Sequence, residues 1–123
     1  MNDAFACFDA HVHVGAWRTP DFAGRASGLD EVRTVLATAG VTGALVMPTD
    51  DGDNDGLLAA LDAVPAGARG PELLAAAWID PHRPDATMDF LHRAGARVRA
   101  LKCHPSFARL PLTAPAYRPF LAF

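Results

Sequence analysis

The chain has 123 residues, of which 50% are hydrophobic and 20% are charged, and its formal net charge is −3. This length predicts one domain, the apolar content excludes a disordered tail, and the acidic balance excludes a broad basic surface for nucleic acid. No apolar run approaches the roughly 18 residues that suggest a membrane span, and the first residues do not read as a secretory signal. With only two cysteines, the sequence predicts a reduced, cytoplasmic protein.

The predicted elements alternate between strands and helices from the first residues onward. A strand is expected over residues 5–14, and a polar loop follows it. A helix is then expected to begin near Leu29, with Ser27 as its N-cap, and to end at Gly40. The apolar run 42–47, closed by Pro48, is typical of a strand buried on both faces, and a second helix is expected over residues 55–64.

The second half of the chain continues this alternation. A strand is predicted over residues 73–80, a helix from Asp85 to Gly95, and a strand over residues 98–104. Residues 106–123 are predicted to form a proline-punctuated loop and the first turns of another helix. Strands that recur with helices between them indicate an α/β fold of parallel strands. The four units predict either a small open sheet or half of a (β/α)₈ barrel.

Two histidines near the end of the first predicted strand form a candidate metal site. His11 and His13 stand two residues apart, so their side chains share one strand face about 6.5–7 Å apart at Cα. At this spacing both imidazoles can bind one ion. Asp9 is expected on the same face, as an acceptor that supports a histidine or a backbone group. Two polar residues on a half-exposed strand are the alternative, but the carboxyl end of a strand is where such folds place their sites.

The sequence around these histidines resembles the opening strand of the amidohydrolase superfamily, specifically its amidohydrolase-related branch of metal-dependent hydrolases. The matching residues are Phe-Asp-Ala-His-Val-His, at positions 8–13. Residues 41–50, 77–81 and 99–105 are similar to the family's second, third and fourth strand segments, in that order. The resemblance therefore covers essentially the whole chain.

This resemblance implies a fold, a cofactor and a reaction. It implies the N-terminal half of a (β/α)₈ TIM barrel over residues 1–123, with a divalent metal, zinc being the expected one, held by His11 and His13. Such enzymes hydrolyse C–N and related bonds with a metal-bound hydroxide, and some relatives decarboxylate aromatic acids. The family's later strands carry further ligands and a base, so we expect this apparently truncated chain to be inactive alone and assign no catalytic residue.

Lys102 and His104 form a second candidate group, because they share one face of the fourth predicted strand. We expect them to contact the negative charge of a small-molecule substrate. Trp17, just past the first predicted strand, is expected either to form a wall of this pocket or only to pack beside it. In some branches of the superfamily a lysine at this position is carboxylated and bridges two metals, which is an alternative. Another alternative is a buried lysine that is paired with a neighbouring acid such as Asp80.

Three functions therefore remain open from the sequence. They are a metal-dependent hydrolase, a metal-dependent decarboxylase, and a non-catalytic α/β module in which the histidines only pack. A half-barrel leaves two sheet edges and its inner face without partners. We therefore expect the chain to self-associate through the unpaired edges, and we expect neither nucleic-acid nor membrane partners.

Overall fold

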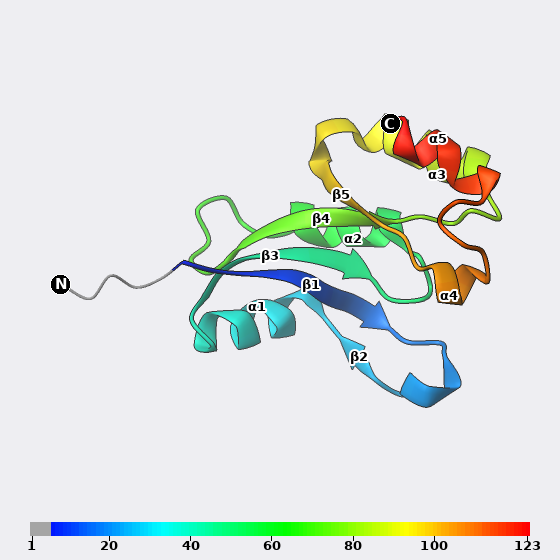
Figure 1. Cartoon of the computed structure of the whole chain (residues 1–123). Helices are drawn as coiled ribbons and strands as arrows, with labels where there is room; N and C mark the ends of the chain where they lie inside the picture. The colour runs from blue at the N-terminus through cyan, green and yellow to red at the C-terminus, as the bar shows by residue number, and fades with distance from the viewer. Residues whose placement is uncertain (1–5) are drawn as a thin grey trace.

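The computed structural model describes residues 6–123 and has an α/β fold around one five-stranded sheet (Figure 1). The strands are β1 (Cys7–Ala16), β2 (Ala26–Ser27), β3 (Val41–Pro48), β4 (Glu72–Trp78) and β5 (Val98–Lys102). The helices are α1 (Leu29–Thr38), α2 (Asn54–Asp62), α3 (Pro84–Ala94), α4 (Pro105–Ala108) and α5 (Arg118–Leu121). Short 3₁₀ turns cover Pro20–Phe22, Gly95–Arg97 and Pro115–Tyr117.

The sheet has the order β2-β1-β3-β4-β5, and its four long strands run parallel. These are the four predicted strands, so the α/β fold and the parallel sheet are confirmed. The sheet stays open, and residues 6–123 show no closure into a barrel. The predicted start of the first strand at Phe5 lies outside the described residues. The fifth strand, β2, pairs antiparallel with the last two residues of β1, and two residues are too few for a periodic signal.

One face of the sheet is packed against the helices and forms the hydrophobic core. Ala44 and Val46 of β3 and Ala75 and Ala77 of β4 are buried in this core. Their helical partners are Val32, Leu36, Leu57, Leu58, Phe90, Leu91, Ala94, Tyr117 and Phe120. Because side chains alternate along a strand, the intervening residues of β3 and β4 face the other side. The helices of the core pack against the first of these sides, and Figure 1 shows the strands running side by side across α2.

The helix starts differ in detail from the prediction. Gly28 takes the N-cap position of α1 without a side-chain bond, because Ser27 belongs to β2. Helix α3 begins at Pro84 rather than after Asp85, since proline suits the first turn of a helix. Asp53 caps α2 by accepting a hydrogen bond from the Gly56 N–H at 2.9 Å. No helix within residues 6–123 is long and apolar enough to cross a membrane.

Two strands end earlier than predicted. β4 stops at Trp78 and β5 at Lys102, so Asp80 and His104 lie in the loops beyond the sheet. Both cysteines are free, and Cys7 is exposed at the start of β1 whereas Cys103 packs against the core. The carboxyl ends of β1, β3, β4 and β5 lie at one end of the sheet, as parallel strands require. His11 and His13 lie in the second half of β1 and Lys102 is the last residue of β5, whereas Trp17 and His104 follow the ends of these strands.

Candidate functional site

The two histidines of β1 converge at this end of the sheet. The Nε2 atoms of His11 and His13 lie 3.0 Å apart, and the ring centroids lie 5.0 Å apart. Zinc binds imidazole nitrogen at about 2.1 Å, so one ion can contact both Nε2 atoms at this separation. The sequence prediction that the two side chains share a face and meet is confirmed. Asp9 does not share the face of His13, because the pairing of β1 with β3 shifts register between Asp9 and Val12.

This register shift gives Asp9 a local role. Asp9 pairs with Ala44, on the core face of the sheet, whereas His13 pairs with Met47 on the opposite face. The Asp9 carboxylate accepts a hydrogen bond of 2.9 Å from the backbone N–H of His11. Asp9 therefore supports the backbone that carries His11, which is the supporting role predicted for it.

A backbone carbonyl orients His13. Its Nδ1 lies 2.7 Å from the carbonyl oxygen of Pro48 at the end of β3. A carbonyl can only accept, so Nδ1 carries the proton and, in the neutral ring, Nε2 keeps its lone pair. Burial lowers the pKa of His13, and His11 and Lys102 lower it further, while the Pro48 bond opposes them. The ring therefore stays neutral at neutral pH, which is the form that binds a metal.

Lys102 completes a cluster of three nitrogens. Its Nζ lies 3.1 Å from Nε2 of His11, although β3 and β4 lie between the strands of these two residues. The sheet is therefore curled enough for the side chains of its outer parallel strands to meet above it. The predicted partner of Lys102, Asp80, instead pairs with Arg83 at 2.8 Å. That ion pair and the His82 N–H outweigh burial and lower the pKa of Asp80.

The three nitrogens cannot all be satisfied by hydrogen bonds. When His11 Nε2 accepts from the Lys102 ammonium, it and His13 Nε2 face each other as two acceptors with no proton between them. When His11 Nε2 instead carries a proton and donates it to His13 Nε2, the Lys102 ammonium lies beside an N–H group and has no acceptor there. Each tautomer leaves one contact unmatched. A cation between the two imidazoles removes this conflict at the histidine pair.

His104 lies at the same end of the sheet, beside Trp78, which was not among the residues predicted for the site. The rings of Trp78 and His104 stack with centroids 5.8 Å apart, and Phe107 lies edge-on to Trp78 at 5.9 Å. Burial lowers the pKa of His104, and the nearby Lys102 lowers it further. Trp78 pairs with Lys102 across β4 and β5, so both point to the side of the sheet that carries His13. Trp78 is the last residue of the central strand β4, and this position was the signal in the sequence that could have predicted it as part of the site.

Trp17 lies against His13, with ring centroids 4.7 Å apart, so the structure places it beside the histidine pair. The loop that follows Trp17 is fixed by Asp50, which was not among the residues predicted for the site. The Asp50 carboxylate accepts backbone hydrogen bonds from Arg18 at 2.7 Å and Thr19 at 2.6 Å, and another from the Thr19 hydroxyl. These bonds outweigh the effect of burial and lower the pKa of Asp50. The Asp50 carboxylate, just after the end of β3, therefore fixes the backbone that directly follows Trp17.

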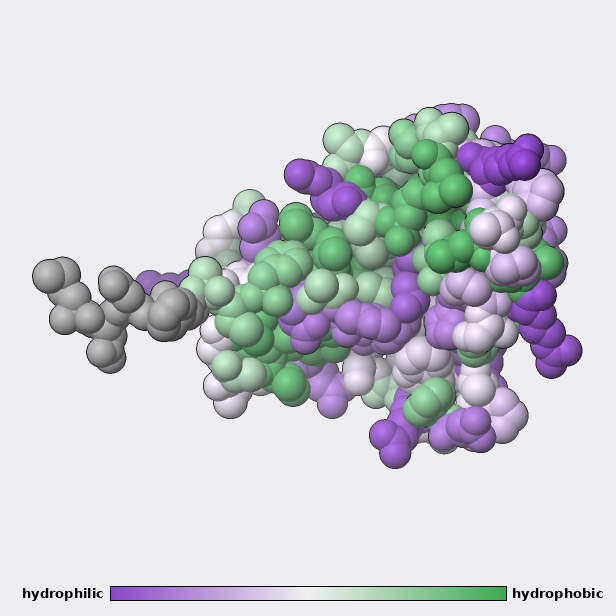
Figure 2. All heavy atoms as spheres, viewed as in Figure 1, coloured by the Kyte–Doolittle hydropathy of each residue, from purple (hydrophilic) through white to green (hydrophobic). Residues whose placement is uncertain are grey.

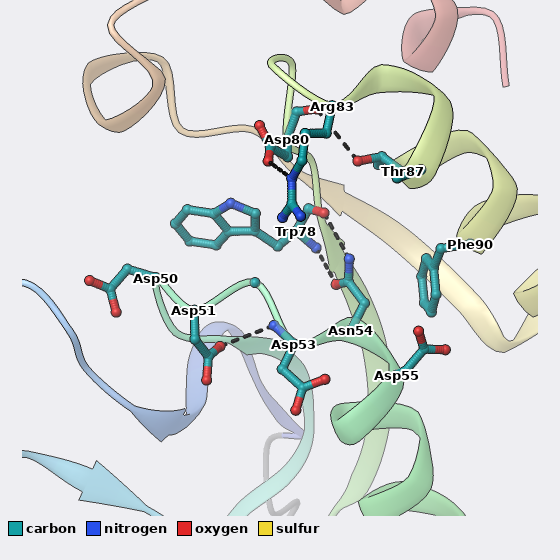
Figure 3. Close-up of a pocket in the computed structure, with 12 residues that line it drawn as sticks. Asp50, Asp51, Asp53, Asn54, Asp55, Trp78, Asp80, Arg83, Thr87 and Phe90 are labelled. Carbon is teal, nitrogen blue, oxygen red and sulfur yellow. Dashed lines mark hydrogen bonds and ion pairs between the residues drawn. The ribbon is translucent and has the colours of Figure 1, made fainter.

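An acidic pocket of about 250 Å³ lies beside this site, between the loops after β3 and β4 (Figure 3). Asn54 lines this pocket and holds the backbone of Trp78. The Asn54 side-chain amide donates to the Trp78 carbonyl at 2.9 Å and accepts from the Trp78 N–H at 2.7 Å. Figure 3 shows Asp51 and Asp53 on the same loop, with the Asp51 carboxylate bonded to the Asp53 backbone. Trp78 thus separates this pocket from the histidines, and its backbone is fixed by α2.

Within the described part of the chain, no group of three or more His, Cys, Asp or Glu side chains is arranged to hold one metal ion. The histidine pair thus offers two ligands, with Lys102, His104 and Trp17 around it. Comparisons with family models, curated proteins and solved structures find no match to this chain.

Proposed function

We propose that this chain is half of a metal-dependent hydrolase barrel of the amidohydrolase-related branch. The support is the order of four parallel βα units, with the paired histidines at the carboxyl end of the first. The curl of the sheet, by which Lys102 of β5 reaches His11 of β1, is what four strands of a barrel wall would have. The proposal assigns the chain a divalent ion, zinc being the expected one, and a small-molecule substrate.

The convergence of the two Nε2 atoms at 3.0 Å is the observation that carries this proposal. Histidine ligands of zinc usually donate their second ring N–H to a carbonyl or carboxylate, which fixes the tautomer. His13 has this arrangement through Pro48. A bound zinc ion would supply a water whose pKa is near 7 and would polarise the substrate.

The surrounding residues are suited to an anionic substrate. Lys102 and His104 offer positive or hydrogen-bonding groups, and the rings of Trp17 and Trp78 lie against His13 and His104, respectively. In the proposed site Lys102 and His104 hold the negative group of the substrate. Trp17 and Trp78 restrict water and favour a flat substrate.

Zinc titration of the purified chain, by calorimetry and by metal analysis after dialysis, tests this proposal. We expect binding in the wild type and its loss in the variants His11→Ala and His13→Ala. His92→Ala is the matched control, because His92 lies on α3 and packs against Phe123, away from the pair. Equal zinc binding by the wild type and by both site variants, or none by the wild type, would contradict the proposal and favour a module in which the histidines only pack.

A further inference from the structure

His82 joins two segments at the carboxyl end of the sheet that are distant in the sequence. It lies in the loop after β4, and its ring nitrogen Nε2 lies 2.8 Å from the carbonyl oxygen of Ala108, the last residue of α4. A carbonyl can only accept, so Nε2 of His82 carries the proton and donates it. The final carbonyls of a helix have no partner inside the helix, and the His82 side chain supplies one for Ala108.

The turn that carries His82 is held by its own hydrogen bonds. The Asp80 carboxylate accepts a bond of 3.0 Å from the His82 N–H and one of 2.8 Å from the Arg83 side chain. The Arg83 N–H donates to the Asp80 carbonyl at 3.1 Å and closes the turn. Pro81, within this turn, is buried and limits the backbone further. The His82 side chain therefore extends toward α4 from a backbone that is fixed in place.

Helix α4 depends on contacts outside itself for its position. It has four residues, whereas isolated helices shorter than about 12 residues are marginal in water. Ala108 packs against the core, but Ser106 and Phe107 are exposed. In the described part of the chain, the bond from His82 is the only hydrogen bond that joins α4 to a segment outside residues 104–110. The place of this helix at the mouth therefore depends on His82.

Helix α4 in turn sets the position of the His104 ring. The Ser106 hydroxyl lies 3.1 Å from Nδ1 of His104, and the Phe107 ring lies edge-on to the His104 ring at 5.4 Å. Both Ser106 and Phe107 belong to α4. A cavity of about 160 Å³ lies between this helix and the loop after β4. Its lining includes Asp80, His82, His104, Phe107 and Ala108.

We propose that His82 is a positioning residue for the anion-binding part of the site: by holding α4, it sets where His104 meets the negative group of the substrate. This role rests on the proposed function, in which Lys102 and His104 hold that group. His82 acts on His104 through α4 rather than by binding the substrate. The neutral Nε2–H form and the protonated ring of His82 both donate, so the bond to Ala108 does not require one charge state.

Benzoate, a flat anion, serves as the probe, and NMR titration of the metal-free chain measures its Kd. His82→Phe keeps a ring and removes the donor, and we expect a roughly fivefold higher Kd for benzoate. His82→Gln keeps a side-chain N–H donor and should restore the wild-type Kd. His92→Phe is the matched control, because His92 lies on α3 and packs against Phe123, and it should leave the Kd unchanged.

The NMR shifts of the His104 ring protons give a second readout, which reports position rather than stability. The rings of Trp78 and Phe107 lie against this imidazole, so its proton shifts change when α4 moves. We expect these shifts to change in His82→Phe and to return in His82→Gln. If His82→Phe does not fold, Ser106→Ala, at an exposed position, removes the contact from α4 to His104 directly and should raise the Kd in the same direction.

The outcomes distinguish this inference from the proposed function. Equal benzoate binding and equal His104 shifts in the wild type and in His82→Phe would overturn the role of His82. No benzoate binding by the wild type, or binding that Lys102→Met leaves unchanged, would also overturn it, whatever the zinc titration shows. Benzoate binding that depends on His82, in a chain that binds no zinc, would support the positioning role and overturn the metal-dependent function. Figure 2 shows the mixed hydrophilic and hydrophobic surface of the molecule in the view of Figure 1.

Discussion

Replacing Lys102 with methionine is expected to tighten zinc binding at the histidine pair. The Lys102 ammonium lies 3.1 Å from His11 Nε2, one of the two proposed ligand atoms. An ion about 2.1 Å from that nitrogen therefore lies within a few ångströms of a positive charge. Methionine keeps most of the length of the side chain and removes the charge.

The size of the effect follows from the charges. Two unit charges 4 Å apart repel by about 1 kcal/mol in water and by about 4 kcal/mol near a protein surface, and a divalent ion doubles either value. Lys102 is only partly buried and can turn away from the ion, so the lower value applies. We expect a gain of about 2 kcal/mol, which corresponds to a roughly 30-fold lower Kd for zinc.

Isothermal titration with Zn²⁺ measures this change directly. Arg99→Met is the matched control, because it removes one positive charge from the same strand, and we expect a much smaller effect from it. Weaker zinc binding in Lys102→Met would refute the reasoning, since it would show that the Lys102 side chain itself helps to hold the ion. A carboxylated lysine would behave in that way.

Three further predictions concern stability. The free energy of unfolding should fall as the pH drops below about 6.5, because His13 binds a proton more readily in the unfolded chain than in the folded state, where its pKa is lowered. Denaturant unfolding at a series of pH values should show that the free energy of unfolding depends less steeply on pH in His13→Asn than in the wild type. Asp50→Asn should cost about 1–2 kcal/mol and speed proteolysis after Arg18, since it weakens the bonds to that loop; unchanged cleavage would contradict this role. Leu91→Ala should cost about 3 kcal/mol in urea unfolding, because Leu91 is fully buried in the core, and a loss under 1 kcal/mol would place it outside a packed interior.

The sequence predicted the parts of the fold that depend on local pattern. The apolar run that ends at Pro48 became β3, and the polar loops with glycine and proline fell between elements. The histidine pair was found because its spacing of two matches the alternation of a strand. The face of Asp9 was predicted wrongly, because a register shift between strands depends on pairing that no local pattern records.

The rest of the site comes from contacts over long sequence separations. Lys102 meets His11 across 91 positions, which required the curl of the whole sheet. Asp50 fixes the loop of Trp17 from the neighbouring strand, and Asn54 holds the backbone of Trp78 from a helix. Aspartate and asparagine in a loop are common, so only the folded arrangement distinguishes these two.

The short strand β2 has a consequence for the outer edge of β1. It occupies the outer hydrogen-bonding groups of Gly15 and Ala16, next to the mouth, and leaves the earlier part of β1 free. Edge strands expose backbone groups that can pair with an extended segment of another chain. By pairing with the last two residues of β1, β2 shortens the stretch of this strand that is open to such contacts.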